Sequence, residues 1–377
     1  MIYLDNAATG GRKPDCVQDA VLSAIKTCAN PGRSGHALSL ACAQQVALAR
    51  KTLNEYFDGY GESNVVFTKN CTEALNIALF GILQHGDHVV ASVMEHNSIL
   101  RPLHLLKNLG YIDYDLCPLQ KDGSLDLSAL KSLIKPTTKL VAITSASNVT
   151  GTVNTPTQVR KHLPKRVLFL CDGAQGAGHY PIKMQEAGID LLCLAGHKGL
   201  MGIQGSGALL FSDRATPSPL LHGGTGSISF SLDMPDFYPD ALEAGTLSYP
   251  AILSLLRGVE KLQAEERDIF DKIKGLTEYC LEQFVTLPNY TLYSAVNPCG
   301  IVAFAHKVLP SQTVADLLNE EFFIAVRGGF HCAPLMHEAL KTQENGLVRV
   351  SFSHYTSRYE IDRLMQALRS IDEKNTL

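Results

Sequence analysis

Residues 167–198 read VLFLCDGAQGAGHYPIKMQEAGIDLLCLAGHK, and two apolar runs in this stretch decide the fold class. Residues 167–171 and 191–195 are short and almost wholly apolar, which is typical of strands buried on both faces of a parallel sheet. Each run leads into a segment that contains glycine and a charged residue. In open α/β sheets, ligands bind beyond the carboxyl ends of the strands, so we expect the functional side chains there.

The same alternation of strands and helices extends outward from this stretch. We predict helices at 14–29, 36–57, 72–83, 98–109, 125–134 and 155–162, and further strands at 65–68, 88–93, 112–117, 140–144 and 207–211. Alternating elements of this kind indicate an α/β domain with a mainly parallel sheet, which we place at residues 15–250. Its last part, residues 213–247, is rich in Gly, Pro and Ser and is predicted to be a loop.

Beyond residue 250 the pattern changes. A long helical pattern at about residues 251–284 is followed by predicted strands at 290–294, 300–305 and 347–352 and helices at 314–321 and 357–371. We therefore expect a smaller α+β domain formed by residues 1–14 and 251–377, with the long helix as the link. Clefts between domains are favoured ligand sites.

Composition excludes several classes of protein. The chain has 377 residues, 45% of them hydrophobic, and a net charge of -4 without a basic stripe, so neither disorder nor a nucleic-acid or anionic-membrane partner is expected. Its apolar runs fall far short of the roughly 20 residues of a membrane span, and MIYLDNAATG does not resemble a signal peptide. Ten cysteines without a C-x-x-C pair predict no metal site, and a reducing cytoplasm is the simplest compartment.

Lys198 and Asp172 are the first candidate site residues. A lysine in a partly desolvated pocket can lose its proton and form a Schiff base, although a lone lysine between glycines is more often an exposed loop residue. Asp172 ends an apolar strand and needs a partner for its charge. A protonated pyridine nitrogen is one partner, and a turn cap is the alternative. Gln175 follows closely enough to reach the phenolic oxygen of the same ring.

Two further candidates follow other strands. NCTEALN at 70–76 places Thr72 at the start of a helix, where backbone N–H groups and a hydroxyl bind phosphate, or where an ordinary cap is formed. His96 follows another strand and can stack on a flat cofactor or move protons, or be satisfied by local hydrogen bonds. Together the four features describe a site for a phosphorylated aromatic aldehyde. A nicotinamide site is less well supported because the GxGxxG motif is absent.

Several motifs together carry a resemblance to a known family. They are YLDNAAT (3–9), EHNS (95–98), SNVTG (147–151), DGAQ (172–175), GHKGLMG (196–202), EAGT (243–246) and VRGGFHCAP (326–334). In this order the chain resembles the class V aminotransferase family, and within it cysteine desulfurases and selenocysteine lyases. The resemblance covers residues 3 to about 355. It implies the PLP-dependent transferase fold (fold type I) and pyridoxal 5′-phosphate as the cofactor.

The resemblance also implies a role for each matching residue. Lys198 would hold the cofactor as a Schiff base, Asp172 would pair with the pyridine nitrogen, and Gln175 would contact the ring oxygen. His96 would stack on the ring, and Thr72 and His197 would bind the phosphate. Thr246 matches a position that reaches the partner subunit's site, which implies a homodimer with shared active sites.

Three residues would act on the substrate. Asn148 and Arg349 match substrate-binding positions, with Arg349 on the α-carboxylate, where a guanidinium binds in bidentate fashion. Cys332 would take sulfur from the substrate as a persulfide, in a short catalytic loop. Read alone, Cys332 is more often a structural thiol, although Arg327 and His331 beside it would favour a thiolate.

Two positions depart from the pattern or lack a role. Ala195 stands where the family usually has a serine or threonine for the phosphate, so another donor, such as glycine-rich backbone or Thr225, would have to replace it. Cys71 lies inside the phosphate loop without an assigned role.

The predicted function is a cysteine desulfurase that releases L-alanine from L-cysteine, with a sulfur-acceptor protein as a possible partner. The alternatives are a selenocysteine lyase, a class V aminotransferase for another small amino acid, and a cofactor-free subunit of a sulfur relay.

Overall fold

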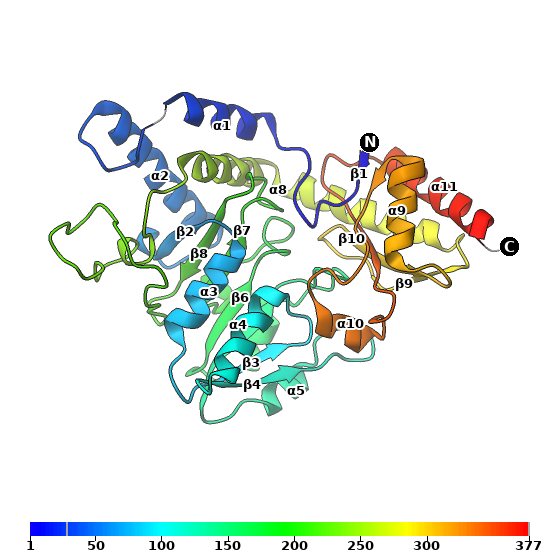
Figure 1. Cartoon of the computed structure of the whole chain (residues 1–377), viewed down its shortest axis with the longest axis horizontal. Helices are drawn as coiled ribbons and strands as arrows, with labels where there is room; N and C mark the ends of the chain where they lie inside the picture. The colour runs from blue at the N-terminus through cyan, green and yellow to red at the C-terminus, as the bar shows by residue number, and fades with distance from the viewer. Residues whose placement is uncertain (28, 376–377) are drawn as a thin grey trace.

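A sheet of seven strands forms the centre of the computed structural model, which describes residues 1–27 and 29–375 (Figure 1). Its strand order is β2-β8-β7-β6-β5-β3-β4. Strand β8 is antiparallel to β2 and β7, and the other neighbours are parallel. The mainly parallel sheet predicted from the sequence is therefore confirmed. The bounds are β2 (Val65–Thr68), β3 (His88–Ser92), β4 (Asp113–Cys117), β5 (Thr138–Thr144), β6 (Leu168–Asp172), β7 (Leu191–Ala195) and β8 (Gly207–Phe211).

Both faces of this sheet are buried, which explains why its strands are apolar throughout. In β6, Phe169 and Cys171 face one core, whereas Leu168 and Leu170 face the other, as the alternation of side chains along a strand requires. Helices α3 (Cys71–Ile82) and α4 (Asn97–Asn108) pack on the second face. The first face is covered by α1 (Asp15–Thr27), α2 (Ala37–Tyr56), α6 (Pro156–Lys161), α7 (Met184–Ala187) and the start of α8 (Tyr249–Phe284).

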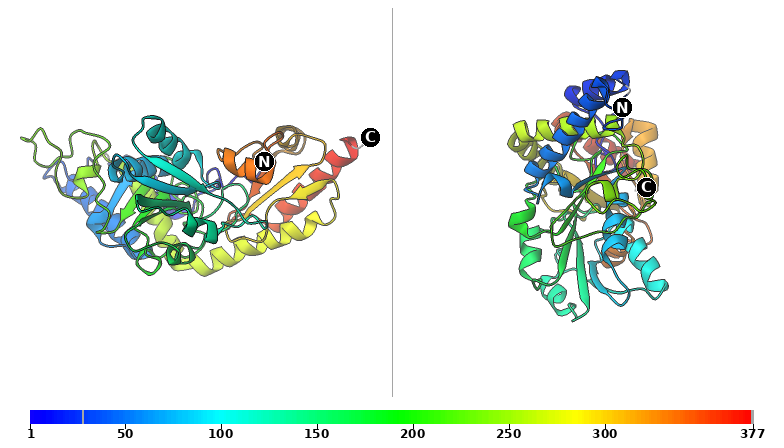
Figure 2. Two further views of the ribbon diagram at one scale, coloured as in Figure 1. Left: turned by 90° about the horizontal axis from the view of Figure 1, so that it is seen from below. Right: turned by 90° about the vertical axis from the view of Figure 1, so that its left-hand side faces the viewer.

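Helix α8 links two hydrophobic cores. Leu256 near its start packs in the core of the large sheet, whereas Cys280 and Phe284 near its end pack in a separate core. The helix has a kink at Glu265, where φ is -130° and ψ is 15°. Figure 2 shows it running along the molecule from the large sheet toward the C-terminal part. Within the described residues, neither this helix nor another combines the length and apolar character needed to cross a membrane.

Two small sheets complete the C-terminal part. Strand β10 (Ile301–His306) pairs antiparallel with β9 (Tyr290–Leu292) and β12 (Val348–Ser351). The N-terminal strand β1 (Ile2–Tyr3) pairs with β11 (Ile324–Ala325), so the first residues of the chain join this part of the molecule. The helices here are α9 (Ser311–Phe322), α10 (Pro334–Leu340) and α11 (Arg358–Asn375). The domain boundaries given above stay a prediction.

The predicted elements agree with the structure to within a few residues. Four short elements, β1, β11, α7 and α10, are not predicted from the sequence. They have two to seven residues each, which is too few to show a periodic pattern. Helix α5 (Leu127–Ser132) is shorter than predicted. The predicted helix at 14–29 ends at Thr27, and residue 28 lies outside the described residues. Residues 213–247 are irregular apart from a 3-10 turn at Asp240–Leu242.

Candidate active site

A cavity of about 230 Å³ lies at the carboxyl edge of the large sheet. It is where β2, β3, β5, β6 and β7 end, because parallel strands bring their carboxyl ends to one edge. Residues from the N-terminal segment and from the strand β12 also line it. The cavity brings together eight of the residues selected from the sequence: Thr72, His96, Asn148, Asp172, Gln175, His197, Lys198 and Arg349.

Lys198 and Asp172 form the charged centre of this cavity. Asp172 is the last residue of β6 and only 2% exposed. One of its oxygens, Oδ1, accepts the Ala174 N–H at 2.9 Å. Burial lowers the pKa of Lys198, and the nearby charge of Asp172 opposes that shift. A lysine whose pKa is lowered by burial is suited to nucleophilic attack on an aldehyde.

The N-terminus of helix α3 faces the cavity. Asn70 caps the helix by accepting the Glu73 N–H at 2.9 Å, and the Thr72 hydroxyl lies 2.8 Å from the hydroxyl of Ser98. The cap leaves other N–H groups of the first turn available, and these groups together with the helix dipole favour an anion. Thr72 and Ser98 add two hydroxyl groups to this end of the cavity, and the Ser98 hydroxyl also lies 2.9 Å from Nδ1 of His96.

His96 caps helix α4 and is neutral. Its Nδ1 accepts the Ser98 N–H at 3.1 Å, and because that backbone group can only donate, the ring proton lies on Nε2. Burial, together with the charges of Lys198 and Arg327, lowers the pKa of His96 to about 4. The imidazole is therefore an uncharged flat surface beside Lys198, able to accept a proton when one is presented to it.

His197 is held from the N-terminal segment. Its Nδ1 lies 3.1 Å from the Thr9 hydroxyl, and its carbonyl oxygen accepts the amine of Lys13 at 2.8 Å. Burial, followed by the charges of Lys198 and Lys13, lowers the pKa of His197 to about 4. It contributes hydrogen bonding, not a positive charge.

The roles predicted for Gln175 and Thr246 stay predictions. The Gln175 amide lines the cavity but donates to the Ala7 carbonyl at 3.0 Å, so it is engaged with the N-terminal segment. Thr246 lines a separate cavity of about 110 Å³ beside Glu243 and Ser206. Within the described residues of one chain, Thr246 therefore does not join the other candidates. Thr225 also lies outside the lining of the main cavity, whereas Ala195 is part of it.

Arg349 is buried and oriented by two contacts. It is 1% exposed, donates from Nη1 to the Asn148 backbone carbonyl at 2.9 Å, and forms an ion pair with Asp5 at 2.9 Å. Its Nε has no hydrogen-bond partner among the described residues, nor has either ring nitrogen of His331. Both side chains line the cavity. Buried polar atoms without partners are costly, so this end of the cavity is suited to a polar, anionic group.

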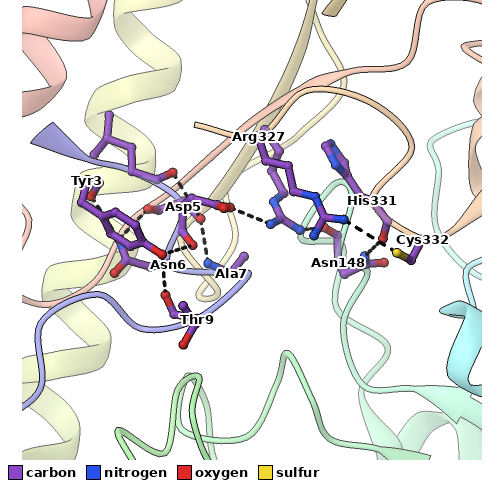
Figure 3. Close-up of polar contacts among 12 residues, drawn as sticks. Tyr3, Asp5, Asn6, Ala7, Thr9, Asn148, Arg327, His331 and Cys332 are labelled. Atoms are coloured by element: carbon purple, nitrogen blue, oxygen red, sulfur yellow. Dashed lines mark hydrogen bonds and ion pairs between the residues drawn. The ribbon is translucent and has the colours of Figure 1, made fainter. Parts of the chain in front are cut away.

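Cys332 is exposed and lies on an open groove of about 440 Å³ that adjoins the cavity. The groove shares Thr72, His96 and Ser98 with the cavity. The thiol lies 3.7 Å from the Arg327 guanidinium (Figure 3). His331 does not provide a second positive charge, because burial lowers its pKa well below the usual value. The positive charge expected of His331 is therefore absent, and Arg327 supplies the positive charge next to the thiol.

The Cys332 loop is held at the backbone carbonyls of His331 and of Cys332 itself. The Asn148 amide donates to the His331 carbonyl at 2.6 Å, and the Asn97 N–H donates to the Cys332 carbonyl at 2.8 Å. His331 and Cys332 both have left-handed backbone conformations, with φ of 51° and 58°. Such conformations are uncommon outside glycine and persist where surrounding contacts enforce them.

The sequence did not assign roles to Ser98 or Glu95, although both belong to the EHNS motif. Ser98 was hidden because its contact with Thr72 joins two different helices. Glu95 is fully buried, and its Oε1 accepts the Ser92 hydroxyl at 2.5 Å and the Thr144 N–H at 3.1 Å. The signal in the sequence was the acidic residue directly before His96 in the EHNS motif. The Glu95 carboxyl connects the turn before His96 with the end of β5.

We predict that Glu95→Gln removes a loss of stability that builds up between pH 4.5 and about 8. Burial raises the pKa of Glu95 from 4.5 to about 8. The unfolded chain therefore ionises first, and the wild type should lose about 1.4 kcal/mol of folding free energy per pH unit between those two values. Gln keeps the Oε1 contacts without a charge. Urea unfolding at pH 5, 7 and 9 should show a growing advantage of the variant, and parallel curves would contradict a protonated Glu95.

A family model for class V aminotransferases matches residues 2–364. The chain therefore belongs to the class V aminotransferase family, and is an enzyme of this class with the fold type I architecture. Within the family it is similar to cysteine desulfurases. The protein of that name from Pectobacterium atrosepticum is 30% identical over 385 residues, covering 98% of this chain and 93% of the relative. A Yersinia pestis cysteine desulfurase is 30% identical over 387 residues, covering 99% and 94%.

Solved structures of cysteine desulfurases are also similar to this chain. The apo cysteine desulfurase of Thermococcus onnurineus superposes with a TM-score of 0.90 at 28% identity, covering 99% of this chain and 95% of the other. An Escherichia coli cysteine desulfurase in an S-sulfonic acid form gives 0.88 at 26% identity, covering 98% and 94%.

Enzymes of this family use pyridoxal 5′-phosphate. The cavity fits that group on the chemistry of its walls. A lysine of lowered pKa lies beside a buried carboxylate at its centre, and a helix N-terminus with two hydroxyls lies at one end. The unpartnered Nε of Arg349 lies in its lining, where a substrate carboxylate would satisfy it.

Proposed function

We propose that this enzyme is a pyridoxal-phosphate-dependent cysteine desulfurase that passes sulfur from L-cysteine to Cys332 and releases L-alanine. The observation that carries the proposal is the position of Cys332. Its thiol is exposed, lies 3.7 Å from Arg327, and lines a groove that adjoins the Lys198 cavity. A transaminase would not need a thiol there.

Pyridoxal phosphate, when bound, supplies an electron sink for the bonds at the substrate Cα. In the proposal Lys198 holds it, Asp172 faces its ring nitrogen, and neutral His96 lies against the ring. Gln175 contacts the ring oxygen, for which its amide would have to share or leave the Ala7 carbonyl. Thr72, His197 and Ser98 bind the phosphate. Ser98 is the candidate for the donor that Ala195 cannot supply, since its hydroxyl lies next to that of Thr72. To donate to the phosphate, this hydroxyl would have to leave Nδ1 of His96, which lies 2.9 Å away.

Arg349 and Asn148 orient the amino acid. Arg349 is held by Asp5 and by the Asn148 carbonyl, which leaves Nε and the second hydrogens of both Nη atoms for the α-carboxylate. A guanidinium fixed by its surroundings loses little entropy when it binds. Arg327 adds a second positive charge in the same wall. Lys198, once free, and His96 would move protons at the substrate carbon atoms.

Sulfur transfer is a displacement at the sulfur of L-cysteine. The Cys332 thiolate forms a bond to that sulfur while the Cβ–Sγ bond of the substrate breaks. The bonding electrons stay with the carbon, which takes up a proton, and alanine leaves. Cysteine and a thiol thus become alanine and a persulfide, without an external oxidant. An acceptor thiol, carried by a partner protein or supplied as a reductant, then removes the outer sulfur.

A homodimer with shared active sites is part of the proposal. Thr246 lies near the end of the 213–247 loop, and Phe230 and Leu232 in the same loop are fully exposed. Large exposed apolar side chains mark interaction surfaces. In the proposed dimer Thr246 reaches the phosphate of the partner subunit. Sedimentation of the purified protein tests it, and a monomer would contradict it.

The experiment that tests the function measures alanine released from L-cysteine and from L-selenocysteine with a reductant present. Alanine from both substrates supports the desulfurase. Alanine from selenocysteine alone would replace the proposal by a selenocysteine lyase. Conversion of the bound cofactor to a pyridoxamine form with a keto acid product, without alanine, would indicate an aminotransferase.

Arg349→Lys should raise KM for L-cysteine about 10- to 100-fold. Lysine keeps the positive charge but loses the bidentate geometry, and hydrogen bonds to charged groups contribute about 1.5–3 kcal/mol. Steady-state kinetics and thermal melting are measured together. Asp5→Asn serves as control, because it removes the ion pair and keeps the guanidinium. If lysine changes only the melting temperature, Arg349 has a structural role alone.

A further inference from the structure

Cys71 is the first residue of helix α3 and lies in the wall of the cavity. We propose that it is a positioning residue whose thiol donates a hydrogen bond to Asp172 and thereby orients that carboxylate, in its ionised form, toward the ring nitrogen of pyridoxal phosphate. The inference rests on the proposed function, because it concerns how this chain holds its cofactor.

The contact lies inside the protein. The Cys71 Sγ is 3.4 Å from Asp172 Oδ1, and the two residues are 7% and 2% exposed. The Ala174 N–H donates to the same oxygen at 2.9 Å. Both donors therefore act on Oδ1. Oδ2 makes no hydrogen bond to the described residues, so it is the oxygen left for a ligand.

The direction of the hydrogen bond follows from the charges. Burial and the carboxylate of Asp172 raise the pKa of the Cys71 thiol well above its usual value. The sulfur therefore keeps its proton, and a thiol next to a carboxylate can only donate. Burial also raises the pKa of Asp172, whereas the Ala174 N–H, Lys198 and the thiol lower it. The thiol thus helps to keep ionised a carboxylate that burial would protonate.

The position of Cys71 joins two parts of the cavity. Its backbone belongs to the first turn of α3, beside Thr72, where the phosphate is proposed to bind. Its side chain reaches the end of β6. Cys71 therefore connects the helix terminus proposed to bind phosphate with the carboxylate proposed to face the ring nitrogen.

The first experiment detects the hydrogen bond in protein freed of cofactor. Infrared spectra of the wild type and Cys71→Ala are subtracted, so that the S–H stretching band of this thiol remains. We expect the band at lower frequency than that of a free thiol, and we expect Asp172→Asn to shift it upward, because an amide oxygen is a weaker acceptor. A band that Asp172→Asn leaves unmoved would show that Cys71 only fills space, and would overturn the proposal.

The second experiment measures the dissociation constant of pyridoxal phosphate. Cys71→Ala should weaken binding about tenfold, the effect of one lost hydrogen bond to a charged group, whereas Cys71→Ser keeps a donor and should stay within about threefold of the wild type. Cys193→Ala is the matched control. Cys193 is fully buried on β7, and its thiol makes no hydrogen bond to Asp172 among the described residues.

The outcomes separate this inference from the proposed function. Equal weakening by Cys71→Ala and Cys193→Ala, or by Cys71→Ala and Cys71→Ser, would reduce Cys71 to a packing residue and leave the desulfurase intact. A wild-type protein that binds no pyridoxal phosphate would overturn the proposed function and, with it, the purpose of the contact. The infrared band would then still report whether the hydrogen bond exists.

Discussion

Cys332→Ala should lower alanine release from L-cysteine by about 10³-fold or more, because it removes the nucleophile of the sulfur-transfer step. The cofactor should stay bound with an unchanged visible spectrum, since Cys332 lines the outer groove and not the Lys198 cavity. Turnover of selenocysteine should be largely spared, because a selenol is already a good leaving group. The measurement is alanine release, with both substrates, at equal cofactor content.

Cys16→Ala provides the control for Cys332→Ala. Cys16 is also exposed, but it lies on α1, outside the lining of the cavity and of the groove. Cys16→Ala should leave the activity unchanged. Like Cys332→Ala, it should reduce by one the number of exposed thiols that an alkylating reagent can modify. If Cys332→Ala retains full activity on L-cysteine, the sulfur does not pass through this residue and the proposed function fails.

Lys198→Ala should abolish the visible absorption band of the bound cofactor and reduce activity by about 10⁴-fold or more, since both the covalent attachment and a proton-transfer group are lost. The apo-protein should remain folded. Desolvation disfavours the charged form of Lys198, so its replacement by alanine should not destabilise the fold. The spectrum after addition of pyridoxal phosphate and the thermal melt of the apo-protein are the measurements.

The matched control is Lys183→Ala. Lys183 is half-buried and donates to the Tyr56 carbonyl at 2.6 Å, outside the residues that line the cavity. It should keep the band and the activity. A visible band that survives in Lys198→Ala would mean that a different amine carries the cofactor, and Lys13, whose amine donates to the carbonyl of His197, would become the next residue to replace.

The sequence could predict the fold because its central strands are buried on both faces. Continuous apolar runs such as those ending at Asp172 and Ala195 are visible without a structure, and the polar residues that follow them mark the carboxyl edge. Elements stabilised by tertiary contacts could not be predicted in this way. Strands β1 and β11 have two residues each and exist because they pair with each other across most of the chain.

In the candidate site, too, local patterns could be predicted from the sequence, whereas contacts between distant segments could not. Residues after strands, such as Lys198 and His96, were selected from local patterns, and the resemblance supplied Arg349 and Cys332. The contacts of Asp5 with Arg349 and of Cys71 with Asp172 join segments far apart in the sequence, which periodicity does not report. The neutral state of His331 was also hidden, because it depends on burial and not on residue type.

The hydrogen bonds at the carbonyls of His331 and Cys332 restrict how sulfur could be delivered from Cys332. The carbonyls of His331 and Cys332 are each held by a hydrogen bond from a different strand–helix connection. In the proposed function, a persulfide on Cys332 would therefore be moved mainly by rotation of its own side chain, because the loop is held at two carbonyls. In the proposed function, the acceptor thiol would therefore have to enter the groove beside α4 to reach Cys332.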